Sequence, residues 1–132
     1  MEPENTTSWQ YKAKSFIQES IRVLRVTKKP DAIELDISCP NTEWNNVQFA
    51  CDSAISAKIV ASVKEVTGKI PVIAKLTPAA NSPVQVGEAC EQAGADALCS
   101  GNTMPGMLID ADARRPVLAF RKGGMSGPAL KP

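Results

Sequence analysis

The sequence predicts an α/β protein in which helices alternate with parallel strands, and two periodicities support that prediction. In residues 32–39, AIELDISC, apolar and polar side chains alternate with the period of two that a strand imposes. Elsewhere apolar residues recur every three or four positions, as in helices that bury one face, first over residues 8–27 and then twice more. Helices of this length join parallel strands by right-handed crossovers, so the units build either an open doubly wound sheet or a barrel.

The first helix is expected over residues 8–27, with Thr7 or Ser8 as its N-cap. The first strand should end at Cys39, because Pro40 has no backbone N–H and restricts the conformation of the residue before it. Cys39 is therefore expected on a loop at the carboxyl end of a strand, where α/β proteins bind their ligands.

The second helix is expected to begin at Asp52 or Ser53, either of which can cap it, and to end at Gly68, where a left-handed residue is favoured. Its expected apolar stripe consists of Ile55, Ile59, Val63 and Val66. The second strand is expected over residues 70–76, with Pro71 at its start, where proline is tolerated.

The third helix is expected to open at Ser82-Pro83, with the serine as N-cap and the proline at the first helical position, and to end at Gly94. Its expected buried stripe consists of Val86, Ala89, Cys90 and Ala93. The third strand should occupy residues 95–101, and its Cys99 is interpreted, like Cys90, as a small buried hydrophobe.

The last part of the chain departs from this alternation. Two short apolar runs, residues 107–110 and 116–119, are separated by ADARR and suggest a small hairpin inserted after the third strand. Residues 122–128, KGGMSGP, are expected to form a flexible loop, with Pro128 placed to start another helix. Three parallel strands cannot close a barrel, which needs eight, so the chain is expected to be an internal part of a larger protein.

Composition and charge exclude several classes of function. The net charge is +1 with no basic stripe, so binding to nucleic acid or to an anionic membrane surface is not expected. No apolar run approaches the roughly 20 residues that cross a bilayer, and the N-terminus lacks the pattern of a signal peptide, which favours a cytoplasmic protein. Four cysteines without a CxxC pair, in a chain with no histidine, argue against a metal site and a disulfide framework.

Polar or reactive residues fall at the carboxyl ends of successive strands or just beyond them. They are Cys39 with Asn41, Lys75, Asn102 with Thr103, and the glycine loop that ends at Gly127. The strand ends of a barrel share one face, so these residues are expected to converge on one pocket. Each also has a plain structural interpretation, as a structural thiol, a lysine that reaches solvent, a capped turn and a tight turn.

The motifs that contain these residues resemble those of one enzyme family. ELDISCPN resembles the ELN-[IL]-SCPN signature of the class 1 dihydroorotate dehydrogenases, and AKLTP resembles their KLSP segment. The run from GNTMPGM to SGPALKP resembles the corresponding run of the type B catalytic subunits, so the likeness extends from Ala32 to Pro132. The resemblance implies a (β/α)8 barrel with FMN across its top, of which this chain spans the third helix to the start of the sixth.

On that resemblance residues 1–132 form a single partial barrel domain, with barrel units missing at both ends. The polypeptide alone is then expected to bind FMN poorly and to be inactive. The whole enzyme is expected to oxidise dihydroorotate to orotate, in pyrimidine biosynthesis. The resemblance also implies a partner subunit that carries an iron–sulfur cluster and FAD and passes electrons to NAD, and hence a homo- or hetero-oligomer.

The resemblance assigns a role to each candidate residue. Cys39 becomes the general base that removes the C5 proton of dihydroorotate while the C6 hydride passes to N5 of FMN. The residues expected at the cofactor are Asp36, Lys75, Gly101 and Gly127. Those expected at the substrate are Asp36, Asn41, Asn102 and Thr103.

Two departures from the family pattern keep other functions open. Asp36 stands where the family has asparagine, and an ionised carboxylate only accepts hydrogen bonds, whereas an amide both donates and accepts. Gly101 replaces a bulky aliphatic residue. One alternative is therefore a related flavin barrel that acts on a different dihydropyrimidine. Another is a partial barrel without cofactor that has a structural or interaction role.

Overall fold

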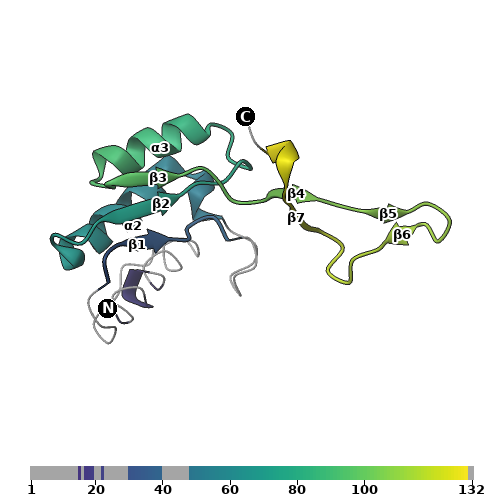
Figure 1. The fold of residues 1–132 in the computed structure, drawn as a ribbon, viewed down its shortest axis with the longest axis horizontal. Helices are drawn as coiled ribbons and strands as arrows, with labels where there is room; N and C mark the ends of the chain where they lie inside the picture. The colour runs from purple at the N-terminus through teal and green to yellow at the C-terminus, as the bar shows by residue number, and fades with distance from the viewer. Residues whose placement is uncertain (1–14, 16, 20–21, 23–29, 40–47, 131–132) are drawn as a thin grey trace, which may run out of the picture.

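The structure is a computed structural model of the 132-residue chain, and it describes residues 15, 17–19, 22, 30–39 and 48–130. At its centre is a parallel sheet with the strand order β1–β2–β3 (Figure 1). The strands are β1 (Ile33–Leu35), β2 (Val72–Lys75) and β3 (Ala97–Cys99). Two helices connect them, α2 (Ser53–Thr67) and α3 (Pro83–Gln92), with a 3-10 turn η1 (Phe49–Cys51) before α2. The predicted α/β class is confirmed.

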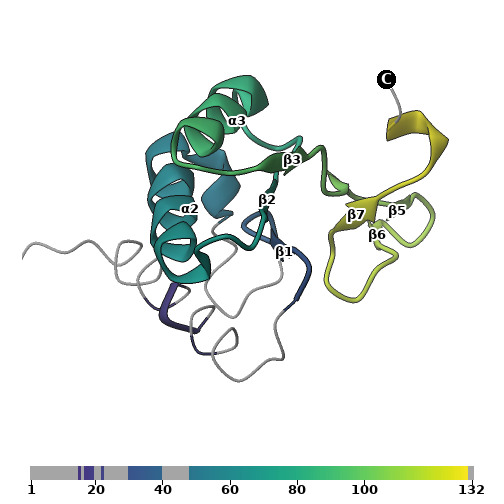
Figure 2. The same cartoon turned by 60° about the vertical axis from the view of Figure 1, so that its left-hand side comes forward.

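The register of the sheet separates its two faces. Leu35 lies beside Ala74, which lies beside Leu98, and side chains in register on parallel strands point the same way. This set faces α2 and α3, which both lie on the same side of the sheet (Figure 2). The alternating set, with Glu34 and Lys75, points to the opposite face, which neither helix covers.

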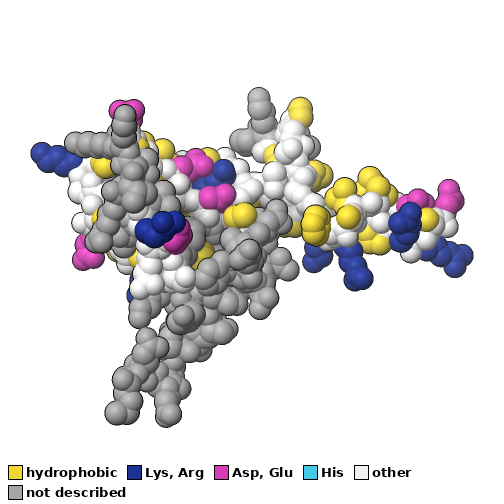
Figure 3. Space-filling model, turned by 90° about the horizontal axis from the view of Figure 1, so that it is seen from below, with side chains coloured by type: hydrophobic (Ala, Val, Ile, Leu, Met, Phe, Trp, Pro, Cys, Tyr) yellow, Lys and Arg dark blue, Asp and Glu magenta, His cyan; other side chains and the backbone are white. Residues whose placement is uncertain are grey.

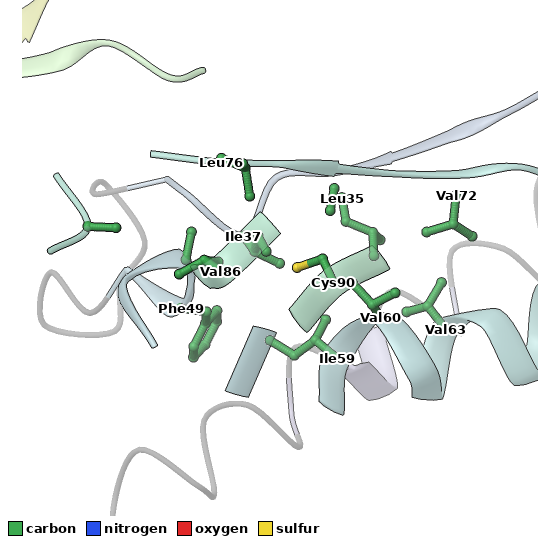
Figure 4. Close-up of a cluster of buried hydrophobic side chains, with 13 residues drawn as sticks. Leu35, Ile37, Phe49, Ile59, Val60, Val63, Val72, Leu76, Val86 and Cys90 are labelled. Atoms are coloured by element: carbon green, nitrogen blue, oxygen red, sulfur yellow. The ribbon is translucent and has the colours of Figure 1, made fainter. Parts of the chain in front are cut away.

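The core lies between the sheet and the two helices. Figure 4 shows Leu35 and Val72 from the strands pointing toward Val60 and Val63 of α2, with Cys90 of α3 beside them. All five side chains are buried. Burial of apolar surface at about 25 cal/mol per Å² is what holds the helices on this face of the sheet.

Helix α2 has the predicted caps but a rotated apolar face. The Asp52 carboxylate accepts from the N–H of Ile55 at 2.9 Å, and Gly68 closes the helix with a φ of 59°. The predicted stripe is wrong at Val66, which is 42% exposed. The buried face is instead Ser56, Ile59, Val60, Val63 and Thr67. This buried face is turned toward Val60 because α2 packs against α3, and Val66 lies outside the face.

Helix α3 also begins and ends as predicted. The Ser82 hydroxyl accepts from the N–H of Gln85 at 3.3 Å, and Gly94 follows the helix with a φ of 101°. Cys90 is fully buried, but the prediction for Cys99 is wrong in part, because its side chain is only half-buried. Cys99 shares the sheet face of Lys75, opposite the helices, and this explains its exposure.

The N-terminal segment is described only in part. Residues 15, 17–19 and 22 are helical, within the predicted helix 8–27, and Ile17 packs against the core. The remaining residues of that helix and its expected caps lie outside the described residues, as does Asn41.

Strand β1 is shorter than predicted, ending at Leu35 and not at Cys39. The N–H of Ile37 donates back to the carbonyl of Leu35 at 3.0 Å, so the chain turns out of the ladder before it reaches Pro40. The carbonyl of Ile37 then accepts from the N–H of Ala50 at 3.0 Å. Ile37 is buried in the core at this turn.

The segment 104–125, called the arm below, extends away from the sheet as two antiparallel tiers (Figure 1). Its inner tier pairs β4 (Met104–Gly106) with β7 (Gly123–Met125), and its outer tier pairs β5 (Ile109–Asp110) with β6 (Arg115–Pro116). The predicted hairpin is present. The prediction of a flexible loop from Lys122 is wrong at β7, because β4 supplies its hydrogen-bond partners. A 3-10 turn, η2 (Pro128–Leu130), starts at the predicted proline.

The arm carries much of the exposed apolar surface. Figure 3 shows apolar side chains gathered along it, with Lys and Arg side chains on its flank. Phe120 is 93% exposed, and Leu108 and Ile109 are also exposed. None of the helices in the described part of the chain is both long and apolar enough to cross a membrane.

Candidate active site at the carboxyl ends of the strands

The segments that follow the three parallel strands meet at one edge of the sheet. The Asn102 side chain, just after β3, donates through Nδ2 to the carbonyl of Ser38 at 3.2 Å and to its Oγ at 2.9 Å, just after β1. The backbone N–H of Asn102 donates to the carbonyl of Leu76, just after β2, at 2.9 Å. The strand ends therefore converge, as the topology predicted.

Cys39 lies within this meeting point. It is a free thiol, half-buried, and it directly follows Ser38, which is held by Asn102. The structure thus brings Cys39 and Asn102 to the same edge of the sheet. Asn41, predicted at the substrate, lies outside the described residues.

Asp36 and Ser38 are linked by a hydrogen bond in the same segment. The Ser38 hydroxyl is 3.0 Å from Oδ1 of Asp36, to which it donates. Ser38 is only 1% exposed, whereas the Asp36 side chain is exposed. Sequence reasoning missed Ser38. The sequence carried no signal for it, because the alternation places Ser38 with the polar side chains of the strand, and only the structure shows that it is buried and needs a polar partner.

Lys75 lies on the open face of the sheet with acidic neighbours. Its Nζ is 3.2 Å from Oε1 of Glu34, and its side chain is 27% exposed. The hydrogen bond from Lys75 to Glu34 raises the pKa of Lys75, and the charges of Glu34 and Asp36 raise it further. Burial raises the pKa of the nearby Cys99 thiol, and the charge of Glu34 adds to that effect. A protonated lysine and a neutral thiol therefore share this face.

A second polar contact joins the same loops, and sequence reasoning missed it. The hydroxyl of Thr77, after β2, donates to Oε1 of Gln48 at 2.8 Å and accepts from the N–H of Ala79 at 3.2 Å. Thr77 is 2% exposed. Gln48 stands directly before η1, so Thr77 fixes the return of the chain toward α2.

The two predicted cofactor glycines differ in their surroundings. A side chain at Gly101 would make ordinary contacts with the carbonyl of Leu76 and with Pro78. Gly127 has a φ of 115°, which L residues rarely adopt. The close approach is instead at Gly124 of β7, where an added Cβ would lie 2.8 Å from Cβ of Thr103. That contact ties the arm to the candidate site.

Parallel strands joined by helices define an α/β protein, and such proteins bind their ligands at the carboxyl ends of the strands, where this chain has polar side chains and a thiol. Comparison with known proteins agrees with that class. The chain belongs to the dihydroorotate dehydrogenase family, whose family model matches residues 7–132.

Curated relatives share this assignment. The chain is 47% identical over 110 residues to a protein of Exiguobacterium sibiricum named dihydroorotate dehydrogenase B (NAD(+)), catalytic subunit. Proteins with the same name from Trichlorobacter lovleyi and Bacillus cytotoxicus are 48% identical over 101 residues and 41% identical over 123 residues. The three alignments cover 82%, 76% and 91% of this chain. They cover only 35%, 33% and 40% of those relatives.

Proposed function

We propose that this chain forms part of the (β/α)8 barrel of an FMN-dependent dihydroorotate dehydrogenase, which oxidises dihydroorotate to orotate in cytoplasmic pyrimidine biosynthesis. The observation that carries the proposal is the convergence of Cys39, Lys75 and Asn102 on one sheet edge, in a chain of this family. The chain spans between 33% and 40% of three curated relatives, which supports further barrel strands pairing with the edges of β1 and β3.

The residues at the open edge fit the ring of a flavin. Lys75 supplies a cation, and Gly101 adds no side chain at the end of β3. When bound, FMN accepts a hydride from the substrate. Lys75 stabilises the negative charge that then develops, and Glu34 keeps its ammonium in place. Gly127 supports a close backbone approach to the ribityl phosphate.

Cys39 is proposed to take the C5 proton of the substrate at its Sγ. A thiol acts as a base in its thiolate form, which a polar and partly exposed setting supports. Cys39 is half-buried, and the contact of Ser38 with Asn102 holds the backbone directly before it. Ser38 and Asn102 thus control where the sulfur lies relative to the substrate.

Asn102, Thr103 and Asn41 are proposed to bind the pyrimidine ring or its carboxylate. Both amide protons of Asn102 face Ser38, and its Oδ1 accepts from the N–H of Thr103 at 2.7 Å. To donate to the substrate, Asn102 therefore exchanges one of its contacts with Ser38 for one with the ligand. Thr103 contributes its hydroxyl, which is half-buried beside β7.

A second subunit is proposed as the electron acceptor. The relatives are named as catalytic subunits of an NAD(+) enzyme. The partner is proposed to carry an iron–sulfur cluster and FAD, which pass electrons from the reduced flavin to NAD. The exposed apolar side chains of the arm support such an assembly, as a homo- or hetero-oligomer.

The test uses the complete product of the encoding gene, purified with FMN. Under anaerobic conditions dihydroorotate is expected to bleach the visible absorption of the bound flavin, and orotate is expected to appear in equal amount. The 132-residue polypeptide alone is expected to bind FMN poorly in a fluorescence titration. A complete product that binds no flavin would favour a partial barrel with a structural or interaction role.

A second candidate is a related flavin enzyme that acts on a dihydropyrimidine without a carboxylate. Asp36 favours it, because its carboxylate lies within electrostatic range of Lys75 and weakens the attraction of that edge for anions. Orotate and uracil make a matched pair of ligands that differ in the carboxylate. Asp36→Asn is expected to raise the affinity for orotate relative to uracil by about tenfold. An unchanged ratio would remove Asp36 from substrate discrimination.

A further inference from the structure

We propose that Ser38 is a positioning residue that couples Asp36 to Asn102 through a hydrogen-bond chain with one permitted direction. The chain runs from Asn102 Nδ2 to Ser38 Oγ, 2.9 Å away, and from the Ser38 hydroxyl to Asp36 Oδ1, 3.0 Å away. Its importance for Cys39 rests on the proposed function, whereas the coupling itself does not.

Two backbone groups fix the orientation of the Asn102 amide. The N–H of Thr103 can only donate, so the side-chain atom 2.7 Å from it is the carbonyl oxygen. The carbonyl of Ser38 can only accept, so the atom 3.2 Å from it is the amide nitrogen. The same nitrogen faces Ser38 Oγ, which must therefore accept from it.

The direction of the remaining link then follows from proton counting. The Ser38 hydroxyl has a single proton, and an ionised carboxylate at position 36 can only accept. That proton is therefore committed to Asp36, which completes the chain. Because Ser38 is 1% exposed, water cannot easily replace either partner, and an unmet hydrogen bond there is costly.

The hydrogen-bond chain spans the sheet edge that holds Cys39, the candidate catalytic residue. Ser38 directly precedes Cys39, and Asn102 is also bound through its N–H to Leu76, after β2. Residue 36 thus acts on Cys39 without contact, because it sets how firmly Ser38 and Asn102 hold the loops together. An asparagine at position 36 would bring both a donor and an acceptor and would leave the direction open.

Reversing the direction of this hydrogen-bond chain tests the proposal. In Asn102→Asp, the donation to the Ser38 carbonyl is lost whatever stands at position 36. In the parent background acceptors also flank the Ser38 hydroxyl on both sides while it has one proton, so one of its two contacts is lost as well. In the double variant with Asp36→Asn, the new amide at position 36 donates to Ser38, and the hydroxyl donates to the carboxylate at position 102. Thermal unfolding of the complete gene product, with both single variants and the double variant, measures the coupling.

We expect Asn102→Asp to lower the melting temperature by on the order of 4 °C in the parent protein, and by clearly less when Asp36→Asn is already present. Equal losses in the two backgrounds would overturn the proposal. If Asn102→Asp alone does not fold, recovery of folding in the double variant supports the coupling, and failure to recover contradicts it.

Alkylation of Cys39 supplies a readout of position that needs neither flavin nor turnover. Peptide mapping after iodoacetamide treatment gives the rate at Cys39 relative to Cys51, which is exposed on η1 and serves as an internal reference. Ser38→Ala should raise this ratio several-fold, because it frees the segment. Asn102→Asp should also raise it, and addition of Asp36→Asn should bring it back toward the parent value. The control Ser62→Ala removes a hydroxyl that donates only to Lys58 on α2, and it should leave the ratio unchanged. A ratio unaffected by Ser38→Ala would overturn the positioning role, even if the protein proves to be an active dehydrogenase.

Discussion

Lys75 on β2 and Glu34 on β1 form an ion pair on the open face of the sheet, with 3.2 Å between Nζ and Oε1. The pair sits beside the strand ends where Ser38 meets Asn102. Glu34 thereby raises the pKa of Lys75 and limits the directions in which its side chain can point. Sequence reasoning placed Lys75 at the end of a strand but did not predict its ion pair with Glu34.

Loss of Glu34 should change how stability depends on alkaline pH. The folded protein raises the pKa of Lys75 above its ordinary value of 10.5, chiefly through the hydrogen bond to Glu34. A raised lysine pKa contributes stability below the unfolded value, and that contribution disappears as the pH rises through the folded value. The parent protein should therefore lose stability between about pH 9 and the strongly alkaline range, and Glu34→Gln should lose less over the same range. Melting temperatures measured across these pH values give both losses. Lys58→Met, which removes an exposed lysine on α2, is the control, and an equal effect there would contradict the assignment.

The rotated apolar face of α2 gives a matched pair of core variants. Val60 is fully buried between the helices and the sheet, whereas Val66 on the same helix is 42% exposed. Val60→Ala should lower the free energy of unfolding by about 2 kcal/mol, from lost burial and a residual cavity. Val66→Ala should change it by less than about 0.5 kcal/mol. Urea denaturation of the two variants measures this difference. A loss at Val66 as large as the loss at Val60 would mean that Val66 is buried, as the sequence predicted.

The contact between the arm and Thr103 gives a second pair. An added Cβ at Gly124 would lie 2.8 Å from Cβ of Thr103, whereas at Gly106, on the paired strand, it would meet Cβ of Met125 at an ordinary 3.7 Å. Gly124→Ala should therefore displace β7 and speed amide hydrogen exchange across the β4–β7 pair. Gly106→Ala should leave the exchange nearly unchanged. Equal protection in both variants would show that Thr103 does not limit the approach of the arm.

The features that sequence reasoning predicted correctly depend on neighbours along the chain. Asp52 and Ser82 cap their helices through contacts three residues away, and Gly94 follows α3 with a positive φ. Those interactions are local, so residue type and spacing specify them. The alternation likewise predicted the burial of Leu35 and Ile37, although not that of Ser38.

The features that sequence reasoning missed depend on partners distant in the chain. Asn102 and Ser38 are 64 residues apart, and Thr77 and Gln48 are 29 residues apart. Strand β7 pairs only because β4 lies beside it. A local pattern contains no information about such partners, so only the structure showed the polar links of the site and the inner tier of the arm, β4 with β7.

The proposed function depends above all on Cys39 acting as the base in flavin-dependent oxidation of dihydroorotate. Anaerobic stopped-flow mixing of the FMN-loaded complete gene product with dihydroorotate, followed by flavin absorbance, tests that role without intermediate assumptions. We expect rapid bleaching in the parent protein and in Cys51→Ser, and bleaching slower by at least about 10²-fold in Cys39→Ser at neutral pH. Bleaching at the parent rate in Cys39→Ser, or a bound flavin that dihydroorotate does not reduce, would contradict it.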